Sequence, residues 1–186
     1  GNGNGLLAEY FKGYNMDALQ YTETDEDINY DWGTGSPNQS KLGVDQFSVR
    51  WSGQIQPLYS EQYTFYVNSD DGVRLTINGQ LLIDNYSVQG AYTRKAVISL
   101  TAGKKYDIKL EYAEGGGNAF CKLEWESPSQ SRQIVPKDQL YSRFPSTGVI
   151  TAYDDGNYGG VGGGLEVGNY TLSDLNFKGI LNDQLY

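Results

Sequence analysis

Hydrophobic and polar residues alternate with a period of two over most of the chain between residues 47 and 126. At the start of this region, Phe47, Val49 and Trp51 alternate with Ser48 and Arg50. The same pattern returns in the segments 63–67, 73–77, 96–100, 106–112 and 121–125. Such alternation is typical of strands that have one face on a core and one face in water. No stretch follows the 3.6-residue period of an α-helix, so the pattern predicts an all-β protein.

The breaks between these segments carry turn residues. Asn78-Gly79 predicts a two-residue hairpin, because both positions of such a turn favour a positive φ. Ala102-Gly103 and the segment Glu114–Asn118 separate later strands. Residues 13–46 are less regular, and we expect long surface loops there with one or two short strands. Short, mostly antiparallel strands at regular spacing predict an antiparallel β-sandwich or barrel.

The character of the chain changes near residue 144. The segment Phe144-Pro145-Ser146-Thr147-Gly148 is typical of a linker. The segment after it contains a Gly-rich stretch and is about 40 residues long, too short to close a core alone in most cases. We therefore predict one sandwich domain over residues 1–143, a linker over 144–148 and a partial second module over 149–186.

The composition excludes several classes of function. The chain has 14 basic and 23 acidic residues, a formal charge of −9, no histidine and a single cysteine, Cys121. It therefore has no Ser-His-Asp or Cys-His relay, no His-ligated zinc and no internal disulfide. The negative charge argues against nucleic acid as a partner and suits a hard cation. No apolar run approaches the roughly 18 residues that cross a membrane, so we expect no membrane insertion.

The remaining aromatic and thiol groups fit a core. Trp51, Trp125 and Cys121 lie on the inward phase of their segments and are expected to be buried. Trp32, beside Gly33 in the irregular region, is expected to be exposed. The acidic run Glu23–Asp27 could bind a cation, but it is interpreted as a solvated loop.

Two adjacent carboxylates stand out at the corner between two predicted strands, in the segment Asn68-Ser69-Asp70-Asp71-Gly72. Neighbouring side chains on a regular strand point to opposite faces. For Asp70 and Asp71 to meet one ion, the backbone must bend sharply, and a cis peptide bond between them would bend it. Ca²⁺ is the natural candidate, because it takes about 6–8 oxygen ligands. Taken alone, the residues favour a solvated Asp-Asp-Gly turn over an ion site.

Ordered blocks from about residue 5 to residue 143 resemble the PA-fourteen domain family, the sandwich named after the N-terminal part of anthrax protective antigen. The blocks that carry the resemblance are Gly5–Phe11, Phe47–Gly53, Glu61–Tyr66, Ser69–Gly79 and Leu123–Trp125. The resemblance implies a β-sandwich that binds glycans and occurs in extracellular enzymes and adhesins. Sugar-binding members of the family hold Ca²⁺ with an Asp-cis-Asp pair and a second loop.

Residue by residue, the resemblance implies a calcium site and a sugar site. Asp70 and Asp71 match the Asp pair, and the second loop maps onto Glu114–Phe120, where Asn118 is the best ligand match and Glu114 the second. Two adjacent sugar hydroxyls would then ligate the ion, and an aromatic face would pack on the C–H side of the sugar. The candidate aromatic platforms are Phe120, Tyr86 and Tyr92, although each alone also fits an ordinary surface residue.

The tail resembles a different family. The segment Tyr153–Gly160 is similar to the first Greek-key motif of the βγ-crystallins. Microbial members bind Ca²⁺ through a motif that Asn182 and Asp183 match in part. Tyr186 stands where a Ser or Thr is expected, so we expect no calcium binding by Asn182 and Asp183 in this fragment.

We therefore predict an antiparallel β-sandwich with a partial Greek-key tail. The predicted function is non-catalytic, Ca²⁺-assisted binding of a polysaccharide or cell-surface glycan, within a secreted or cell-surface bacterial protein. One alternative is a structural or protein-interaction module in which Asp70 and Asp71 only brace a loop, with or without Ca²⁺. A second is a fragment of an enzyme whose active site lies elsewhere in a longer parent. No acidic pair stands out as a catalytic acid and nucleophile.

Overall fold

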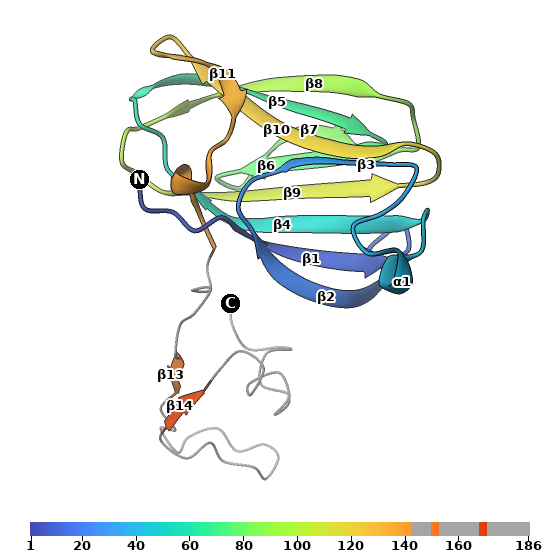
Figure 1. The fold of residues 1–186 in the computed structure, drawn as a ribbon. Coiled ribbons are helices and arrows are strands. Elements are labelled where there is room, and N and C mark those ends of the chain that lie inside the picture. The colour runs from blue at the N-terminus through green and yellow to red at the C-terminus, as the bar shows by residue number, and fades with distance from the viewer. Residues whose placement is uncertain (143–149, 153–167, 171–186) are drawn as a thin grey trace. The chain divides into compact units, whose positions relative to one another are not determined.

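The computed structural model describes residues 1–142, 150–152 and 168–170, and the chain forms two compact units, Gly1–Phe144 and Pro145–Tyr186. The first unit is a sandwich of two antiparallel sheets (Figure 1). Its strands are β1 Leu6–Lys12, β2 Ala18–Asp25, β3 Asn29–Gly33, β4 Phe47–Ile55, β5 Glu61–Asp70, β6 Gly72–Ile77, β7 Gln80–Asn85, β8 Tyr92–Leu100, β9 Tyr106–Glu114, β10 Ala119–Ser127, β11 Gln130–Ile134 and β12 Leu140–Tyr141. The short helices are α1 Gln39–Leu42 and the 3-10 turn η1 Lys137–Gln139.

The two sheets have different strand orders. The larger sheet runs β2-β1-β4-β9-β6-β7, with β12 paired to the end of β4. The smaller sheet runs β11-β10-β5-β8, with β3 paired to β10. Every pairing in both sheets is antiparallel. The predicted all-β, antiparallel sandwich is therefore confirmed.

The core follows the alternation in the sequence. The inward residues of five of the six predicted strands are buried, and the largest of them, Trp51 and Trp125, are fully enclosed. In the sixth, segment 96–100, Leu100 is buried, while Ala96 and Ile98 are only partly buried. Trp125 packs against Tyr63, with ring centroids 5.0 Å apart. Cys121 is also in the core, as expected. Only 38% of the residues are hydrophobic, and large aromatic side chains supply much of the apolar area that the core needs.

Trp32 differs from the expectation. It lies on β3 rather than in a loop, and its ring packs 5.7 Å from the rings of Phe47 and Tyr112. The side chain is therefore half-buried against the core, not exposed. The alternation in β3 was too short to stand out, because this five-residue edge strand pairs only with β10 and its inward residues are Tyr30 and Trp32 alone.

The irregular region 13–46 holds two strands, β2 and β3, and the single-turn helix α1. Asn38 caps this helix, because its side-chain oxygen accepts a hydrogen bond from the backbone N–H of Lys41. Four residues are too few to show a 3.6-residue period, so the sequence pattern could not indicate α1.

The predicted hairpin at Asn78-Gly79 is confirmed. β6 and β7 pair directly, and the two turn residues have φ values of 51° and 74°. These left-handed angles match the twist of the flanking strands.

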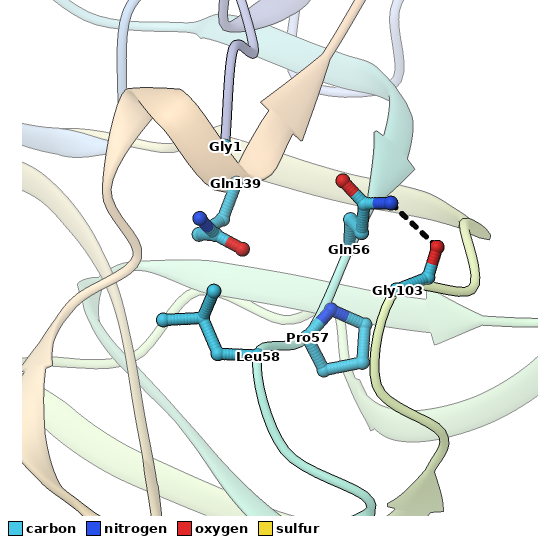
Figure 2. A pocket seen from close by; sticks show the side chains of 6 residues that line it. All are labelled: Gly1, Gln56, Pro57, Leu58, Gly103 and Gln139. Carbon is cyan, nitrogen blue, oxygen red and sulfur yellow. Dashed lines mark hydrogen bonds between the residues drawn. The ribbon is translucent and has the colours of Figure 1, made fainter.

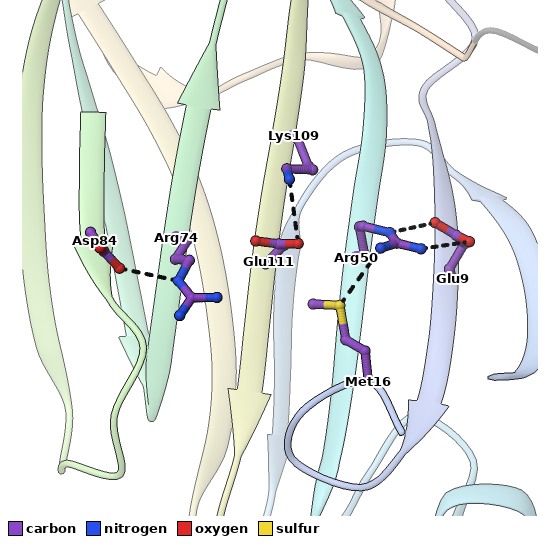
Figure 3. Close-up of polar contacts among 7 residues, drawn as sticks. All are labelled: Glu9, Met16, Arg50, Arg74, Asp84, Lys109 and Glu111. Atoms are coloured by element: carbon purple, nitrogen blue, oxygen red, sulfur yellow. Dashed lines mark hydrogen bonds and ion pairs between the residues drawn. The ribbon is translucent and has the colours of Figure 1, made fainter. Parts of the chain in front are cut away.

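A row of alternating charges crosses the outer face of the larger sheet (Figure 3). Strand register places Glu9 beside Arg50, Arg50 beside Glu111, Glu111 beside Arg74, and Arg74 beside Asp84. Ion pairs join Arg50 to Glu9 and Arg74 to Asp84. The row therefore joins five neighbouring strands through opposite charges, which favours their observed register.

In the second unit, β13 Ile150–Ala152 pairs in antiparallel fashion with β14 Gly168–Tyr170. The remainder of the predicted Greek-key motif, with Asn182 and Asp183, lies outside the described residues. Within the described part of the chain, no helix is long and apolar enough to cross a membrane.

Candidate functional site

The candidate site lies at one end of the sandwich, at the turn between β5 and β6 and the loop between β9 and β10. β5 ends at Asp70 and β6 begins at Gly72, while β9 ends at Glu114 and β10 begins at Ala119. Gly72 is the register partner of Ala113, and Phe120 is the register partner of Asp70. The Asp pair and the predicted second loop therefore meet at one end of the sandwich. In Figure 1 this is the end with α1, and the N-terminus lies at the other end.

Asp71 joins two loops through its carboxylate. The side chain is only 2% exposed, and the peptide bond that joins it to Asp70 is cis, as predicted. One carboxylate oxygen accepts the backbone N–H of Gln89 at 2.7 Å, and the other accepts the N–H of Gly115 at 2.9 Å. Asp71 thus fixes the loop after β7 and the loop after β9 against one corner of the sandwich, the turn between β5 and β6.

Asp70 is the more accessible member of the pair. Its side chain is half-buried. Burial, and then the nearby charge of Asp71, raise the pKa of its carboxyl group. Its carbonyl oxygen accepts a hydrogen bond from the Tyr112 hydroxyl at 2.5 Å. The two carboxyl groups are therefore close enough to repel each other.

Glu114 adds a third carboxyl group to this corner. It is fully buried, and one oxygen lies 3.0 Å from the Tyr112 hydroxyl, while the other has no hydrogen-bond partner in the described part of the chain. Burial is the main cause that raises the pKa of Glu114 to about 7, and the charges of Asp71 and Asp70 raise it further. Among the described residues, none of these three carboxylates forms an ion pair. The corner therefore brings three acidic groups together without a basic side chain paired to any of them in the described residues.

The chemistry of these groups fits a hard cation with mixed oxygen ligands. In the described part of the chain, no three acidic, His or Cys side chains are placed to hold a metal by themselves. Ca²⁺ also accepts amide, carbonyl and hydroxyl oxygens, which a loop and a sugar can supply. Asn118 is exposed in the loop two residues before Phe120, the register partner of Asp70. Asp70, Asp71, Glu114 and Asn118 could thus contribute to such a site.

Tyr14 belongs to this corner and did not stand out in the sequence. Its buried hydroxyl has no hydrogen-bond partner among the residues that the structure describes, and a Cβ on Gly72 would lie 2.8 Å from it. Burial raises the pKa of this phenol, and the charges of Asp71 and Glu114 raise it further. The residue lies in the turn after β1, far from the Asp pair in sequence, so spacing could not reveal it.

The three predicted aromatic platforms are in different environments. Tyr86 is covered, because the Arg74 guanidinium lies 4.3 Å from its ring centre and its hydroxyl donates to the Tyr14 carbonyl at 2.9 Å. Tyr92 is 57% exposed, with the Arg94 guanidinium 3.6 Å from its ring centre. Phe120 is half-buried. Tyr92 is therefore the most accessible ring of the three.

A cavity of about 240 Å³ lies elsewhere on the sandwich. Figure 2 shows its lining, which is Gly1, Gln56, Pro57, Leu58, Gly103 and Gln139. None of the predicted site residues lines it. The candidate site is instead formed by loops at the end of the strands.

Comparisons with known proteins agree with this architecture. The model of the PA14 (PA-fourteen) domain family matches residues 2–139. The anti-sigma-I factor RsgI3 of Acetivibrio thermocellus is 47% identical over 154 residues, which are 83% of this chain but only 23% of that protein.

Two solved structures illustrate the range of the match. An anti-sigma factor domain-containing protein from Clostridium clariflavum has a TM-score of 0.72 and 43% identity, over 79% of this chain and 50% of that one. The epithelial adhesin 6 A domain of Candida glabrata, solved in complex with Galβ1-3GlcNAc, has a TM-score of 0.63 and 17% identity, over 83% and 95% of the two chains. The second likeness is one of fold alone. With the family model matched over most of the sandwich, the chain belongs to the PA14 domain family.

Proposed function

We propose that this domain is a non-catalytic, calcium-assisted carbohydrate-binding module. The observation that carries the proposal is the group of three carboxyl groups at one corner, Asp70, Asp71 and Glu114, with no ion-pair partner among the described residues. Isolated like charges at a half-buried corner are unfavourable unless a cation compensates for them. The exposed Asn118 and the accessible ring of Tyr92 are the further groups that a sugar site needs.

Each residue has a defined task in this proposal. A bound Ca²⁺ would supply positive charge and coordination positions for two neighbouring sugar hydroxyls. Asp70 and Asn118 reach solvent and face the ligand, while Asp71 and Glu114 stay behind them in the buried part of the corner. Tyr92 offers an apolar ring surface to the C–H side of a sugar. The binding of single sugars is expected to be weak, and repeated contacts with a polymer would strengthen it.

The relatives support a glycan partner and a larger parent protein. One structural neighbour carries a bound sugar in its solved complex, and close sequence relatives are named as anti-sigma factors. We infer that the domain is the extracellular part of a bacterial protein, and that a polysaccharide or cell-surface glycan reaches it there. In a parent of the anti-sigma type, the domain would detect the glycan rather than hydrolyse it.

One observation favours a second candidate function. Both oxygens of Asp71 accept backbone N–H groups from two loops, so this residue stabilises the corner without any ion. In a purely structural module, Asp71→Asn would lower the melting temperature and leave no glycan affinity to change.

The test is isothermal titration of the chelated domain with Ca²⁺, followed by a glycan panel with and without Ca²⁺. We expect calcium binding, and glycan binding that disappears on chelation. Asp70→Ala should abolish both, because it removes the accessible carboxylate and leaves the loop contacts of Asp71 in place. Asp107→Ala is the matched control, since Asp107 is an exposed carboxylate near the start of β9, the end of that strand away from Glu114. Equal sugar binding after chelation, or in Asp70→Ala, would exclude the proposed mechanism.

A further inference from the structure

The segment Gly43–Gln46, which connects α1 to β4, contacts the loop Gly115–Gly117 at two points. The Gln46 side-chain amide donates to the carbonyl oxygen of Gly115 at 2.5 Å. The Asp45 carboxylate accepts the backbone N–H of Gly117 at 3.3 Å. This connection lies in the irregular part of the sequence, more than 60 residues before the loop that it contacts.

The Gly115–Gly117 loop depends on such outside contacts. Three consecutive glycines offer no side chains of their own to fix a conformation, and Gly117 has a φ of 106°. Gly115 is held through both of its backbone groups, by Asp71 on its N–H and by Gln46 on its carbonyl. A Cβ on Gly115 would lie 2.8 Å from a methyl carbon of Val88, so the loop is also closely packed.

Gln46 is itself held in an unusual conformation. Its φ of 56° is in the left-handed region, which non-glycine residues rarely adopt. Its carbonyl oxygen accepts the N–H of Gly13 at 2.7 Å, so Gln46 also joins the turn that carries Tyr14. Such conformations persist where several contacts determine them together, and they concentrate at binding sites.

We propose that Asp45 and Gln46 are positioning residues of the candidate site. They hold the Gly115–Gly117 loop so that Asn118, at its end, faces the same ligand as Asp70. The inference rests on the proposed function for the ligand, while the anchoring of the loop is a property of the domain by itself.

The first test measures the loop in the chelated domain, by amide hydrogen exchange in NMR spectra. Gln46→Ala should speed exchange of the Gly115 amide about 3- to 10-fold, because it removes one of the contacts that fix this residue. Gln56→Ala is a closely matched control. Gln56 also donates its side-chain amide to a glycine carbonyl, that of Gly103, at 2.5 Å (Figure 2), far from the Asp pair. Unchanged exchange in Gln46→Ala would overturn the inference.

The second test measures binding of Ca²⁺ alone by titration calorimetry. Gln46→Ala and Asp45→Ala should each weaken calcium binding about 3- to 10-fold, while Gln56→Ala should not. Asp45→Asn should restore wild-type affinity, because the amide oxygen accepts the same hydrogen bond from Gly117. If Asp45→Asn binds as weakly as Asp45→Ala, Asp45 acts through its charge, and its positioning role is wrong.

The two proposals fail in different ways. A wild-type domain that binds neither Ca²⁺ nor any glycan would overturn the proposed function, and with it the binding role of Asp45 and Gln46. A wild-type domain that binds, with an affinity unchanged in Gln46→Ala and Asp45→Ala, would overturn this inference alone.

Discussion

At the scale of single residues, Asp70 and Asp71 differ in their exposure to solvent and in their hydrogen bonds to the loops, and the sequence could not show this difference. Asp70 is half-buried and faces solvent, whereas Asp71 is buried and accepts two backbone N–H groups. Two adjacent identical residues in a sequence give no indication of which one will be available to a ligand and which one will hold the loops in place. The distinction comes from the loops at Gln89 and Gly115, which reach Asp71 from distant parts of the chain.

Glu114 carries a prediction about pH. Its pKa is raised to about 7 in the folded chain, above the ordinary value of 4.5, so the folded state binds more protons than the unfolded state between these values. The free energy of unfolding of the chelated domain should therefore fall as pH rises from 5 to 8. Glu114→Gln keeps the shape of the side chain and removes its charge. Between pH 5 and pH 8, the free energy of unfolding of the variant should rise by about 2.5 kcal/mol relative to that of wild type.

Denaturant unfolding at the two pH values, in the presence of a chelator, measures this difference. Glu9→Gln is a control, because Glu9 lies on the outer face of the larger sheet and is paired with Arg50. A difference between Glu114→Gln and wild type that does not change with pH would contradict the prediction.

At the scale of the elements, alternation identified the strands that have one face in the core. β4, β5, β6, β8, β9 and β10 coincide with the segments where the period of two is clear. The edge strands β2 and β3 are mostly polar, since each has a neighbour on one side only. Their pairing is decided by the sheet that they join, and no local pattern could specify it.

The charge row on the larger sheet predicts unequal coupling between its ion pairs. Arg50 meets Glu9 through two contacts, at 2.7 and 3.1 Å, and both side chains are partly buried. Arg74 meets Asp84 through one contact at 3.1 Å, and both side chains are more exposed. A double-mutant cycle should give a coupling energy of about 1 kcal/mol for Arg50–Glu9 and about 0.3 kcal/mol for Arg74–Asp84. Both values should fall at high salt, and equal couplings would contradict the geometric argument.

At the scale of the whole sandwich domain, the candidate site lies at one end of the strands, and the contact between Asn4 and Ser142 lies at the other. β4 shows this directly, because Phe47 at its start pairs with Glu114, while Ile55 at its end pairs with Leu140. The sequence could predict the sandwich and nominate the Asp pair, because alternation and a local motif carry that information. It could not predict that the segment Gly43–Gln46 would contact the Gly115–Gly117 loop, because strand pairing alone brings them together.

This separation predicts that stability and binding can be changed independently. Asn4 and Ser142 form a reciprocal pair at the end away from the site, with hydrogen bonds of 2.7 and 2.9 Å. Asn4→Ala removes both bonds and should lower the free energy of unfolding by about 1–2 kcal/mol. Because Asn4 lies at the far end of the strands that lead to Asp70 and Glu114, calcium affinity in titration calorimetry should remain at its wild-type value. A loss of affinity in Asn4→Ala would mean that the loops of the site respond to the stability of the whole domain, and not only to the contacts around Asp71.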